Sequence, residues 1–392
     1  MAMKAVYIPV GATGHVLASL PMVRALVASG TSVVYFAPER YRAVVEQTGA
    51  TFSPMPAVAA DGPVEGGGDF TAALPLVFLS EAAGVIGTIL PVIETFAPDV
   101  ILADELALAG RLAAKKLSLP LVMVFTSYAP CEKFSICRFW PKTPDTHPAR
   151  AAAAQLAARF TREYGVPPLD LYAIFEGTGD FNVCTLTRAF QPEGDSFGES
   201  FYFAGAQIAP RASGSSWQPP QDSRPLIYTS LGSLFNNWPE FYAMLFPIVR
   251  ELDVHVVCAL GDTLRPEDLG PVPENVTLLP FAPQLQILPH TDCFITHAGT
   301  GSAMEALYFG APCVCLPQME EQQLTAARML HTGIACASIA RAELTPQRLA
   351  HAIDTALHDG AFLARAREAS RLARTQSSAE GAAQAILRFM GG

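Results

Sequence analysis

The 392-residue sequence predicts an α/β protein made of two domains, each built on a parallel sheet. Three observations support this prediction. Apolar strand-like runs alternate with helix-like segments, the alternation starts again after a polar, proline-rich segment, and the strand-like runs are apolar throughout. Strands that are apolar on both faces are typical of parallel sheets covered by helices on both sides. The chain is also longer than one average domain.

The first half of the chain alternates in the order strand, helix, strand. The strand-like runs are KAVYIPV from residue 4, TSVVYFAP from 31, PDVILADE from 98 and PLVMVFTS from 120. The helix-like segments, with apolar residues spaced near 3.6, are HVLASLPMVRALVASG from 15, ERYRAVVEQTG from 39 and LALAGRLAAKKLSLP from 106. Gly30 and Gly49 end the first two helices, where glycine commonly follows the last helical residue.

The second half repeats this pattern after the segment AQIAPRASGSSWQPPQDSRP. Its strand-like runs are RPLIYTS from 224, DVHVVCAL from 253, NVTLLPF from 275, CFIT from 293 and PCVCLP from 312. We therefore expect an N-terminal domain over residues 1–205, a linker over 206–225 and a C-terminal domain over 226–375. Two similar α/β domains predict a cleft between them.

Composition and charge exclude several classes of function. The net charge is −10 and no cluster of Lys and Arg stands out, which argues against nucleic acid or an anionic membrane as the main partner. Eight scattered cysteines without a CxxC pair indicate reduced thiols in a cytoplasmic protein. The N-terminus does not resemble a signal peptide.

Residues 71–97 form the most apolar stretch of the chain. Glu81 and two prolines interrupt it, which argues against a membrane-spanning helix and against stable membrane insertion. We interpret the stretch as a buried or pocket-lining helix, with contact to a membrane surface as the alternative.

The stretch VGATGHVLASLP, residues 10–21, resembles a dinucleotide-binding turn only in part. Leu17 stands where the third glycine of that motif belongs, and Glu39 lies beyond Pro38 instead of ending the second strand. A glycine turn that only positions the next helix is one interpretation. The residue placed at the start of that helix is His15.

A histidine at this place has the properties of a general base. The positive end of a helix lowers the pKa of an imidazole, and ligands of open α/β folds bind at the carboxyl edge of the sheet. A base also needs an orienting acid, and Asp104 ends a strand that reaches the same edge. The alternatives are a solvated turn histidine and an aspartate that caps the following helix.

The second domain contains a similar junction in FITHAGTGSAMEALYFG, residues 294–310. His297 and the Gly299–Ser302 turn crowd the start of a helix, where free backbone N–H groups, the helix dipole and hydroxyls can bind a diphosphate. Glu305, one turn into the helix, can accept hydrogen bonds from ribose. A glycine-rich turn without a ligand and a solvated glutamate are the alternatives.

The segment PFAPQLQILPHTDCFITHAGTGSAMEALYFGAPCVCLPQMEEQQLTAARM resembles the donor-binding signature of family 1, the UDP-glycosyltransferase-like enzymes. By pattern it is most similar to the bacterial antibiotic and macrolide glycosyltransferases. GATGHVLASLPMVRAL, Asp104 and the turn SLGS at 230–233 resemble the same family. The resemblance implies a GT-B fold of two Rossmann-like domains that face each other across a cleft. It places the acceptor in the first domain, the nucleotide sugar in the second, and a final helix, residues 376–392, back against the first.

The family also implies a role for each matching residue. His15 resembles the general base and Asp104 the carboxylate that orients it, in an inverting reaction that needs no metal and no cofactor. Phe281 takes the place where the family often has a stacking tryptophan, Thr325 replaces the usual asparagine, and Glu321 with Gln322 replaces an Asp-Gln pair that holds the sugar. The implied nucleotide-sugar site consists of Ser230, Gly232, Ser233, Phe281, Ala282, Gln284, His297, Gly299, Thr300, Gly301, Ser302, Glu305, Glu321 and Gln322.

The expected substrates are a UDP- or dTDP-sugar and a hydroxyl group of a lipophilic small molecule such as a macrolide, polyketide or phenolic aglycone. Candidate acceptor-pocket residues are Phe78, Phe134, Phe139 and Trp140, although aromatic side chains more often only pack. We expect a monomer or homodimer, with no metal site. A non-catalytic relative that binds nucleotide sugars, a nicotinamide-dependent oxidoreductase and a sugar-nucleotide epimerase are the alternatives.

Overall fold

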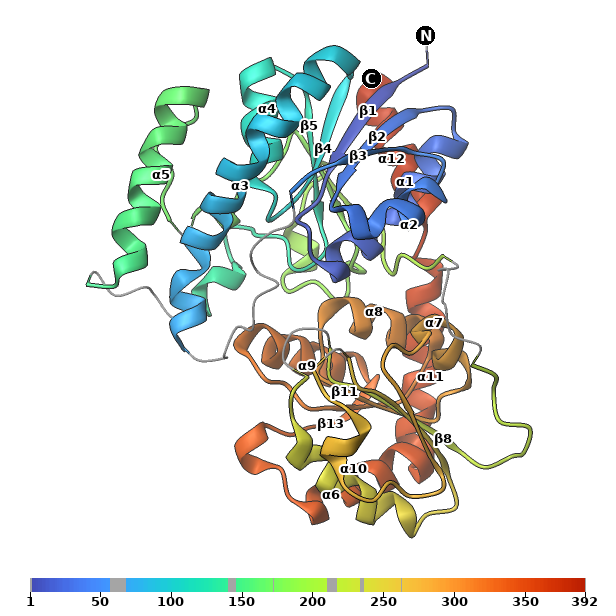
Figure 1. Cartoon of the computed structure of the whole chain (residues 1–392). Helices are drawn as coiled ribbons and strands as arrows, with labels where there is room; N and C mark the ends of the chain where they lie inside the picture. The colour runs from blue at the N-terminus through green and yellow to red at the C-terminus, as the bar shows by residue number, and fades with distance from the viewer. Residues whose placement is uncertain are drawn as a thin grey trace. The chain divides into compact units, whose positions relative to one another are not determined.

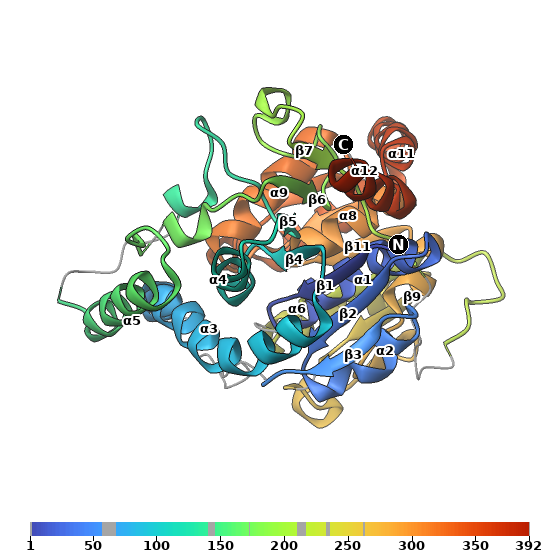
Figure 2. The same cartoon turned by 90° about the horizontal axis from the view of Figure 1, so that it is seen from above.

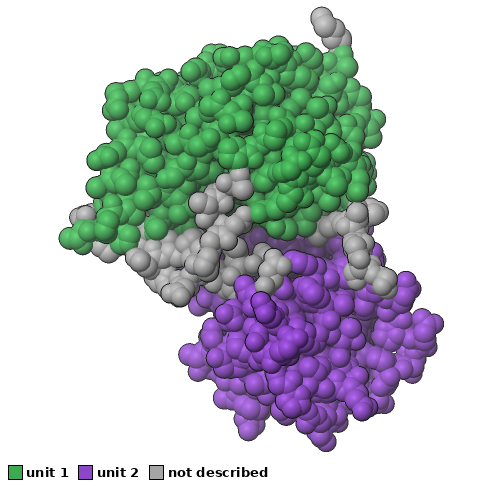
Figure 3. Space-filling view, viewed as in Figure 1, with its two compact units in different colours: residues 1–209, 378–392 green, residues 210–377 purple. Residues whose placement is uncertain are grey.

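The computed structural model describes residues 2–56, 68–139, 146–171, 173–209, 217–232, 236–261 and 263–391. The chain divides into two compact units (Figure 3): unit 1 consists of Met1–Ala209 and Ser378–Gly392, and unit 2 of Pro210–Ser377. Two of the candidate site residues, Trp140 and Ser233, lie outside the described residues.

Unit 1 contains a seven-stranded sheet in the order β3-β2-β1-β4-β5-β6-β7, with every pair parallel. The strands are β1 (Lys4–Ile8), β2 (Ser32–Ala37), β3 (Thr51–Pro54), β4 (Val100–Asp104), β5 (Leu121–Phe125), β6 (Phe181–Cys184) and β7 (Phe201–Phe203). The predicted parallel sheet is thus confirmed. The strand order reverses between β1 and β4, and ligands of open α/β sheets bind at such a point.

The helices of unit 1 are α1 (Thr13–Ala28), α2 (Arg42–Glu46), α3 (Gly68–Phe96), α4 (Leu108–Leu117), α5 (Pro148–Tyr164) and α12 (Ala379–Gly391). The C-terminal helix α12 packs against α1, in red and blue in Figure 1. Ala382, Ala383 and Ile386 are buried in the core of unit 1, and the Phe389 ring stacks on Phe181 with centroids 5.3 Å apart. This confirms that the last helix returns to the N-terminal domain.

Helix α3 contains most of the apolar stretch at residues 71–97. It continues through both Pro75 and Pro91, because a proline removes one backbone hydrogen bond and can bend a helix without ending it. Among the described residues, its Ala73–Phe96 portion is the one helix long and apolar enough to cross a membrane, and 39% of its most apolar window is buried in the protein. Figures 1 and 2 show α3 beside α5, and α3 also packs on α4.

Unit 2 contains a six-stranded parallel sheet in the order β10-β9-β8-β11-β12-β13. Its strands are β8 (Leu226–Ser230), β9 (His255–Ala259), β10 (Val276–Leu279), β11 (Cys293–Thr296), β12 (Cys313–Cys315) and β13 (Ala335–Ser338). Its helices are α6 (Pro239–Arg250), α7 (Gln284–Ile287), α8 (Thr300–Phe309), α9 (Glu320–Thr332), α10 (Pro346–His358) and α11 (Gly360–Thr375). The strand order reverses between β8 and β11, and all eight cysteines of the chain are free thiols.

Candidate functional site

The candidate site of unit 1 lies where β1 and β4 end. His15 occupies the first turn of α1, which follows β1, and Asp104 is the last residue of β4. Because β1 and β4 are adjacent and parallel, the two residues meet at one sheet edge, with His15 Nδ1 2.7 Å from Asp104 Oδ2. The Asp104 side chain is fully buried, whereas 21% of the His15 side chain is exposed. The pair thus combines a shielded carboxylate with an accessible imidazole.

Asp104 also organises the turn that follows β4. Its Oδ1 accepts a hydrogen bond of 2.9 Å from the backbone N–H of Leu106. Helix α4 begins at Leu108 with Ala107 as its N-cap, so Asp104 is not the cap residue of that helix. One carboxyl group therefore holds the local turn with one oxygen and contacts His15 with the other.

Two further residues contact this pair, and the sequence analysis did not single them out. Thr126 follows β5, and its Oγ1 lies 2.8 Å from His15 Nδ1. Glu105, beside Asp104 in sequence, is buried and accepts hydrogen bonds from Thr126 Oγ1 at 3.2 Å and from the backbone N–H groups of Thr126 and Ser127, both at 3.0 Å. Their position directly after β4 and β5, at the edge where the strand order reverses beside β4, is the signal that could have identified them.

His15, Asp104 and Glu105 also form a three-residue group whose possible metal-ligand atoms lie within 4.8 Å of one another. Spacing along the chain does not reveal this group, because β1 and β4 bring together residues far apart in sequence. The carboxyl oxygens already face the N–H and O–H donors of Leu106, Thr126 and Ser127. Donors occupy the lone pairs that a cation would need, so the group is better suited to holding and moving a proton.

Glu81 of α3 is a third carboxyl group close to His15. Burial, with the charge of Asp104, raises the pKa of Glu81 to about 8, although a hydrogen bond from the Gly11 backbone and the proximity of His15 lower it. Burial and the charge of Asp104 also raise the pKa of Glu105, although His15 and a hydrogen bond from the Thr126 backbone lower it. Within the described part of the chain, Glu81 Oε2 is buried without a hydrogen-bond partner. Glu81 is therefore mainly neutral at pH 7.

The described aromatic candidates for an acceptor pocket differ in exposure. Phe78 of α3 is half-buried and packs edge-on against Phe175. Phe134 is buried against Tyr128, and Phe139, which also contacts Phe134, is 50% exposed. The structure thus shows packing contacts for two of these residues and an accessible surface for the third.

A second candidate site, in unit 2, is built around His297, which follows β11. A β-carbon at Gly232 would lie 2.7 Å from His297 Nε2, and one at Gly299 would lie 2.5 Å from it. Gly232 also has a φ of +89°, in the left-handed region that favours glycine. Both turns therefore require glycine so that their backbones can lie against the imidazole.

Burial lowers the pKa of His297 to about 4, although a contact with the Ser230 backbone raises it. Its imidazole is therefore neutral at pH 7, because desolvation disfavours the charged form. In the described residues, His297 Nδ1 is buried with no hydrogen-bond partner.

Helix α8 begins at Thr300, directly after its N-cap residue Gly299, and Gly299 has no side chain that could cap the helix. The first intrahelical bond runs from the Ala303 N–H to the Gly299 carbonyl, so the N–H groups of Thr300, Gly301 and Ser302 have no acceptor within the helix. This end of the helix also carries the positive end of the helix dipole. The turn therefore has the features of an anion-binding site.

Gln284 connects α7 to α8 and to β8. Its Nε2 donates to Glu305 Oε2 at 2.6 Å and to Ser302 Oγ at 3.2 Å, while its Oε1 accepts from Tyr228 Oη at 3.2 Å. Glu305 is buried. The structure thus brings together three of the candidate residues, Gln284, Ser302 and Glu305, and fixes the orientation of the Glu305 carboxylate.

The remaining candidates of unit 2 surround this core at different depths. The Phe281 side chain is 65% exposed, and neighbouring Ala282 and the strand-end Ser230 are half-buried. Gln322 is buried, and its Oε1 accepts from the Gln318 backbone at 2.8 Å. Buried Thr325 donates to the Glu321 carbonyl at 3.0 Å.

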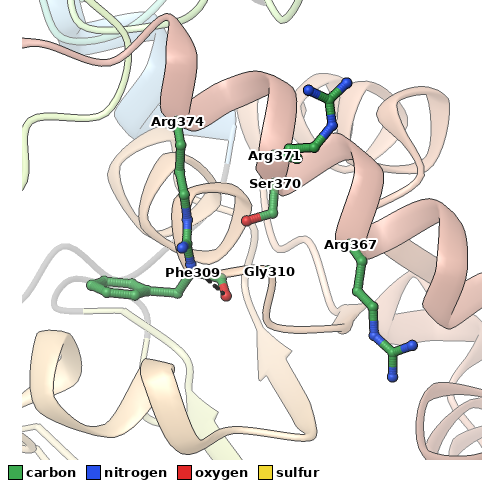
Figure 4. A pocket seen from close by; sticks show the side chains of 6 residues that line it. All are labelled: Phe309, Gly310, Arg367, Ser370, Arg371 and Arg374. Carbon is green, nitrogen blue, oxygen red and sulfur yellow. Dashed lines mark hydrogen bonds between the residues drawn. The ribbon is translucent and has the colours of Figure 1, made fainter.

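Unit 2 also has a hollow lined by Phe309, Gly310, Arg367, Ser370, Arg371 and Arg374 (Figure 4). Arg374 donates to the carbonyls of Tyr308 and Phe309 at the end of α8, and Arg371 pairs with Glu368. These two arginines therefore serve a helix end and a surface ion pair. None of the lining residues was a candidate from the sequence.

Comparison with known proteins identifies the family. Residues 243–387 match a protein family described as the C-terminal domain of proteins similar to erythromycin biosynthesis protein CIII. The NDP-glycosyltransferase YjiC of Bacillus subtilis is 31% identical over 391 residues, which cover 98% of this chain and 96% of YjiC.

Two solved structures agree with this assignment over the whole chain. The glycotransferase of kitacinnamycin has a TM-score of 0.86 at 28% identity and covers 99% of both chains. The calicheamicin glycosyltransferase CalG4 has a TM-score of 0.84 at 27% identity, with 100% of this chain and 98% of that chain covered. Together with the two parallel-sheet units, these similarities show that the chain has a GT-B fold, is a glycosyltransferase and belongs to the family 1, UDP-glycosyltransferase-like enzymes.

Proposed function

We propose that this glycosyltransferase transfers a sugar, with inversion, from a UDP- or dTDP-sugar to a hydroxyl group of a lipophilic natural-product acceptor. The observation that carries the proposal is the contact between His15 and Asp104, at 2.7 Å. The antibiotic-related names of its relatives support an acceptor such as a macrolide, polyketide or phenolic aglycone.

His15 acts as the general base in this proposal. Asp104 accepts a hydrogen bond from Nδ1–H and stabilises the imidazolium that forms when Nε2 takes the proton of the acceptor hydroxyl. General base catalysis of this kind contributes about 10²–10⁴-fold to the rate. Phe78, Phe134, Phe139 and Trp140 remain the proposed acceptor-pocket residues.

The unit 2 residues hold the donor in this proposal. The free N–H groups at the start of α8 bind the diphosphate, and neutral His297 donates a hydrogen bond to it. Glu305, oriented by Gln284, accepts hydrogen bonds from the ribose, and exposed Phe281 stacks on the base. The proposed donor residues around them are Ser230, Gly232, Ser233, Ala282, Ser302, Glu321 and Gln322.

The proposed reaction is one displacement at the anomeric carbon. The bond from the acceptor oxygen to that carbon forms while the bond to the diphosphate oxygen breaks, and UDP or dTDP leaves with the electron pair. The helix end and the polar groups of the α8 turn stabilise the charge that develops on the diphosphate. This stabilisation is why we propose that transfer needs no metal ion. We also propose a cytoplasmic enzyme that acts as a monomer or homodimer.

Calorimetric titration with UDP, dTDP and NAD⁺ in separate runs, with EDTA present, tests the donor class. We expect binding of UDP or dTDP and none of NAD⁺. Binding of NAD⁺ alone would contradict the proposal and would favour the oxidoreductase alternative. The anomeric coupling constant of the product, measured by proton NMR, tests inversion, since an α-linked donor must give a β-glycoside.

A further inference from the structure

The imidazole of His15 has two neighbours at the same nitrogen. Nδ1 lies 2.7 Å from Asp104 Oδ2 and 2.8 Å from Thr126 Oγ1. Thr126 Oγ1 in turn lies 3.2 Å from Glu105 Oε1. A continuous chain of hydrogen-bonding groups therefore runs from Glu105 through the Thr126 hydroxyl to Nδ1 of His15.

The contacts of Glu105 determine the direction of these hydrogen bonds. Its Oε1 accepts from the Ser127 N–H and from the Thr126 hydroxyl, and its Oε2 accepts from the Thr126 N–H, so both carboxyl oxygens face donors. The hydroxyl of Thr126 then donates its proton to Glu105 and offers a lone pair to His15 Nδ1. With two acceptors at Nδ1, the proton of the neutral imidazole belongs on Nδ1.

We propose that Glu105 is a positioning residue for His15 and that it acts through the hydroxyl of Thr126. The pair Glu105–Thr126 selects the tautomer with Nδ1 protonated and holds the ring so that Nε2 carries the lone pair. This inference rests on the proposed role of His15 as the base. Neither residue touches the reacting atoms; their effect is on the imidazole.

Asp104 alone would hold the His15 ring less firmly than Asp104 and Thr126 together. A single acceptor at Nδ1 allows the plane of the imidazole to rotate about that one contact, whereas the two acceptors restrain the ring from two directions. The titratable groups around Glu105 come from several elements. Asp104 of β4 and His15 of α1 act on the pKa of Glu105, Glu105 acts on the pKa of Tyr7 of β1 and Cys184 of β6, and Asp104 and His15 also act on Glu81 of α3. The Thr126 contact is therefore best tested with neutral substitutions, which leave these charges in place.

The decisive pair of variants is Thr126→Val and Thr126→Ser. Valine keeps the shape of threonine and removes the hydroxyl, and serine restores the hydroxyl. We expect Thr126→Val to lower kcat about 10-fold, as the loss of one hydrogen bond to the base predicts, and to leave the KM for the nucleotide sugar unchanged. Thr126→Ser should keep kcat within about threefold of wild type, because its hydroxyl can make both contacts. Exposed Thr95, which bonds only within α3, provides the matched control Thr95→Val.

Glu105→Gln tests the other end of the chain. An amide nitrogen in the place of Oε1 would donate to the Thr126 hydroxyl, which would then donate to His15 Nδ1, and this favours the wrong tautomer. We expect a fall in kcat similar to that of Thr126→Val. If Glu105→Gln does not fold, Thr126→Val decides the question, because it leaves the carboxyl and both its backbone donors in place.

Nitrogen-15 NMR of the histidine side chains, with His15 assigned from a His15→Gln variant, gives a readout that a merely structural role would not change. We expect mainly the Nδ1–H tautomer in wild type and in Thr126→Ser, and a mixture in Thr126→Val. A wild-type tautomer and a wild-type kcat in folded Thr126→Val would overturn the inference. If wild type transferred no sugar, the proposed function would fail, but the tautomer measurement needs no substrate and would still test this inference.

Discussion

The substitution Gly299→Ala tests the diphosphate half of the account with little other disturbance. Gly299 has a φ of −66°, which alanine adopts without strain. A β-carbon there would lie 2.5 Å from His297 Nε2 and 3.1 Å from Cε1. Because unstrained contacts between such atoms lie at about 3.5–4.0 Å, the imidazole must move by about 1 Å.

This displacement sets the size of the expected effect. A hydrogen bond to a charged group contributes about 1.5–3 kcal/mol, so its loss weakens binding about 10-fold or more. We predict that calorimetry gives a Kd for UDP or dTDP raised by that factor in Gly299→Ala. Gly360→Ala in the same unit is the matched control, since a β-carbon at Gly360 meets no atom within 4 Å. Wild-type affinity in folded Gly299→Ala would refute the assigned contact between His297 and the diphosphate.

Three further predictions follow from single contacts. Glu305→Gln should weaken the binding of UDP or dTDP about 10-fold, because it replaces the carboxylate that accepts hydrogen bonds from the ribose. The binding of inorganic pyrophosphate, which has no ribose, should not change. Equal losses of affinity for both ligands would contradict the ribose role. The pKa of Glu81 is about 8 in the folded chain against 4.5 as its ordinary value, so the folded state holds this proton more tightly and wild-type stability falls as pH rises from 4.5 to 8. The melting temperature of Glu81→Gln relative to wild type should therefore increase between pH 5 and pH 8, and a constant difference would argue against the raised pKa. Phe389→Ala should lower stability by about 2 kcal/mol through loss of stacking on Phe181, whereas Leu372→Ala, on an exposed side chain, should not; equal thermal shifts would argue that α12 adds little to unit 1.

The sequence was sufficient for the architecture because apolar strand runs and glycine-ended helices are local signals. The runs ending at Asp104 and Ser230 became strands of two parallel sheets, and Gly30 and Gly49 have the positive φ that ends a helical turn. Strands β3, β6, β7 and β13 were missed, because runs of three or four residues such as FNVC have no clear alternation. The path of α3 through Pro75 and Pro91 depends on packing against α4 and α5, which local proline rules do not include.

The candidate site was predictable to the extent that its residues stand at strand ends. His15 and Asp104 fall at the ends of adjacent strands, so their contact follows from the sheet order. The bonds that Thr126 and Glu105 make depend on side-chain direction, which no spacing along the chain encodes. The neutral state of His297 likewise depends on burial, which the composition of its turn does not reveal.

Removal of the proposed base tests the central claim most directly. In a panel of macrolide, polyketide and phenolic acceptors with UDP- and dTDP-sugars, acceptor-dependent release of the nucleotide reports turnover. His15→Ala should lower this turnover by about 10²–10⁴-fold and leave the Kd for UDP or dTDP unchanged. His358→Ala removes an exposed histidine that lies 2.9 Å from Asp354, and it should turn over as wild type does. Undiminished turnover in folded His15→Ala would contradict the account.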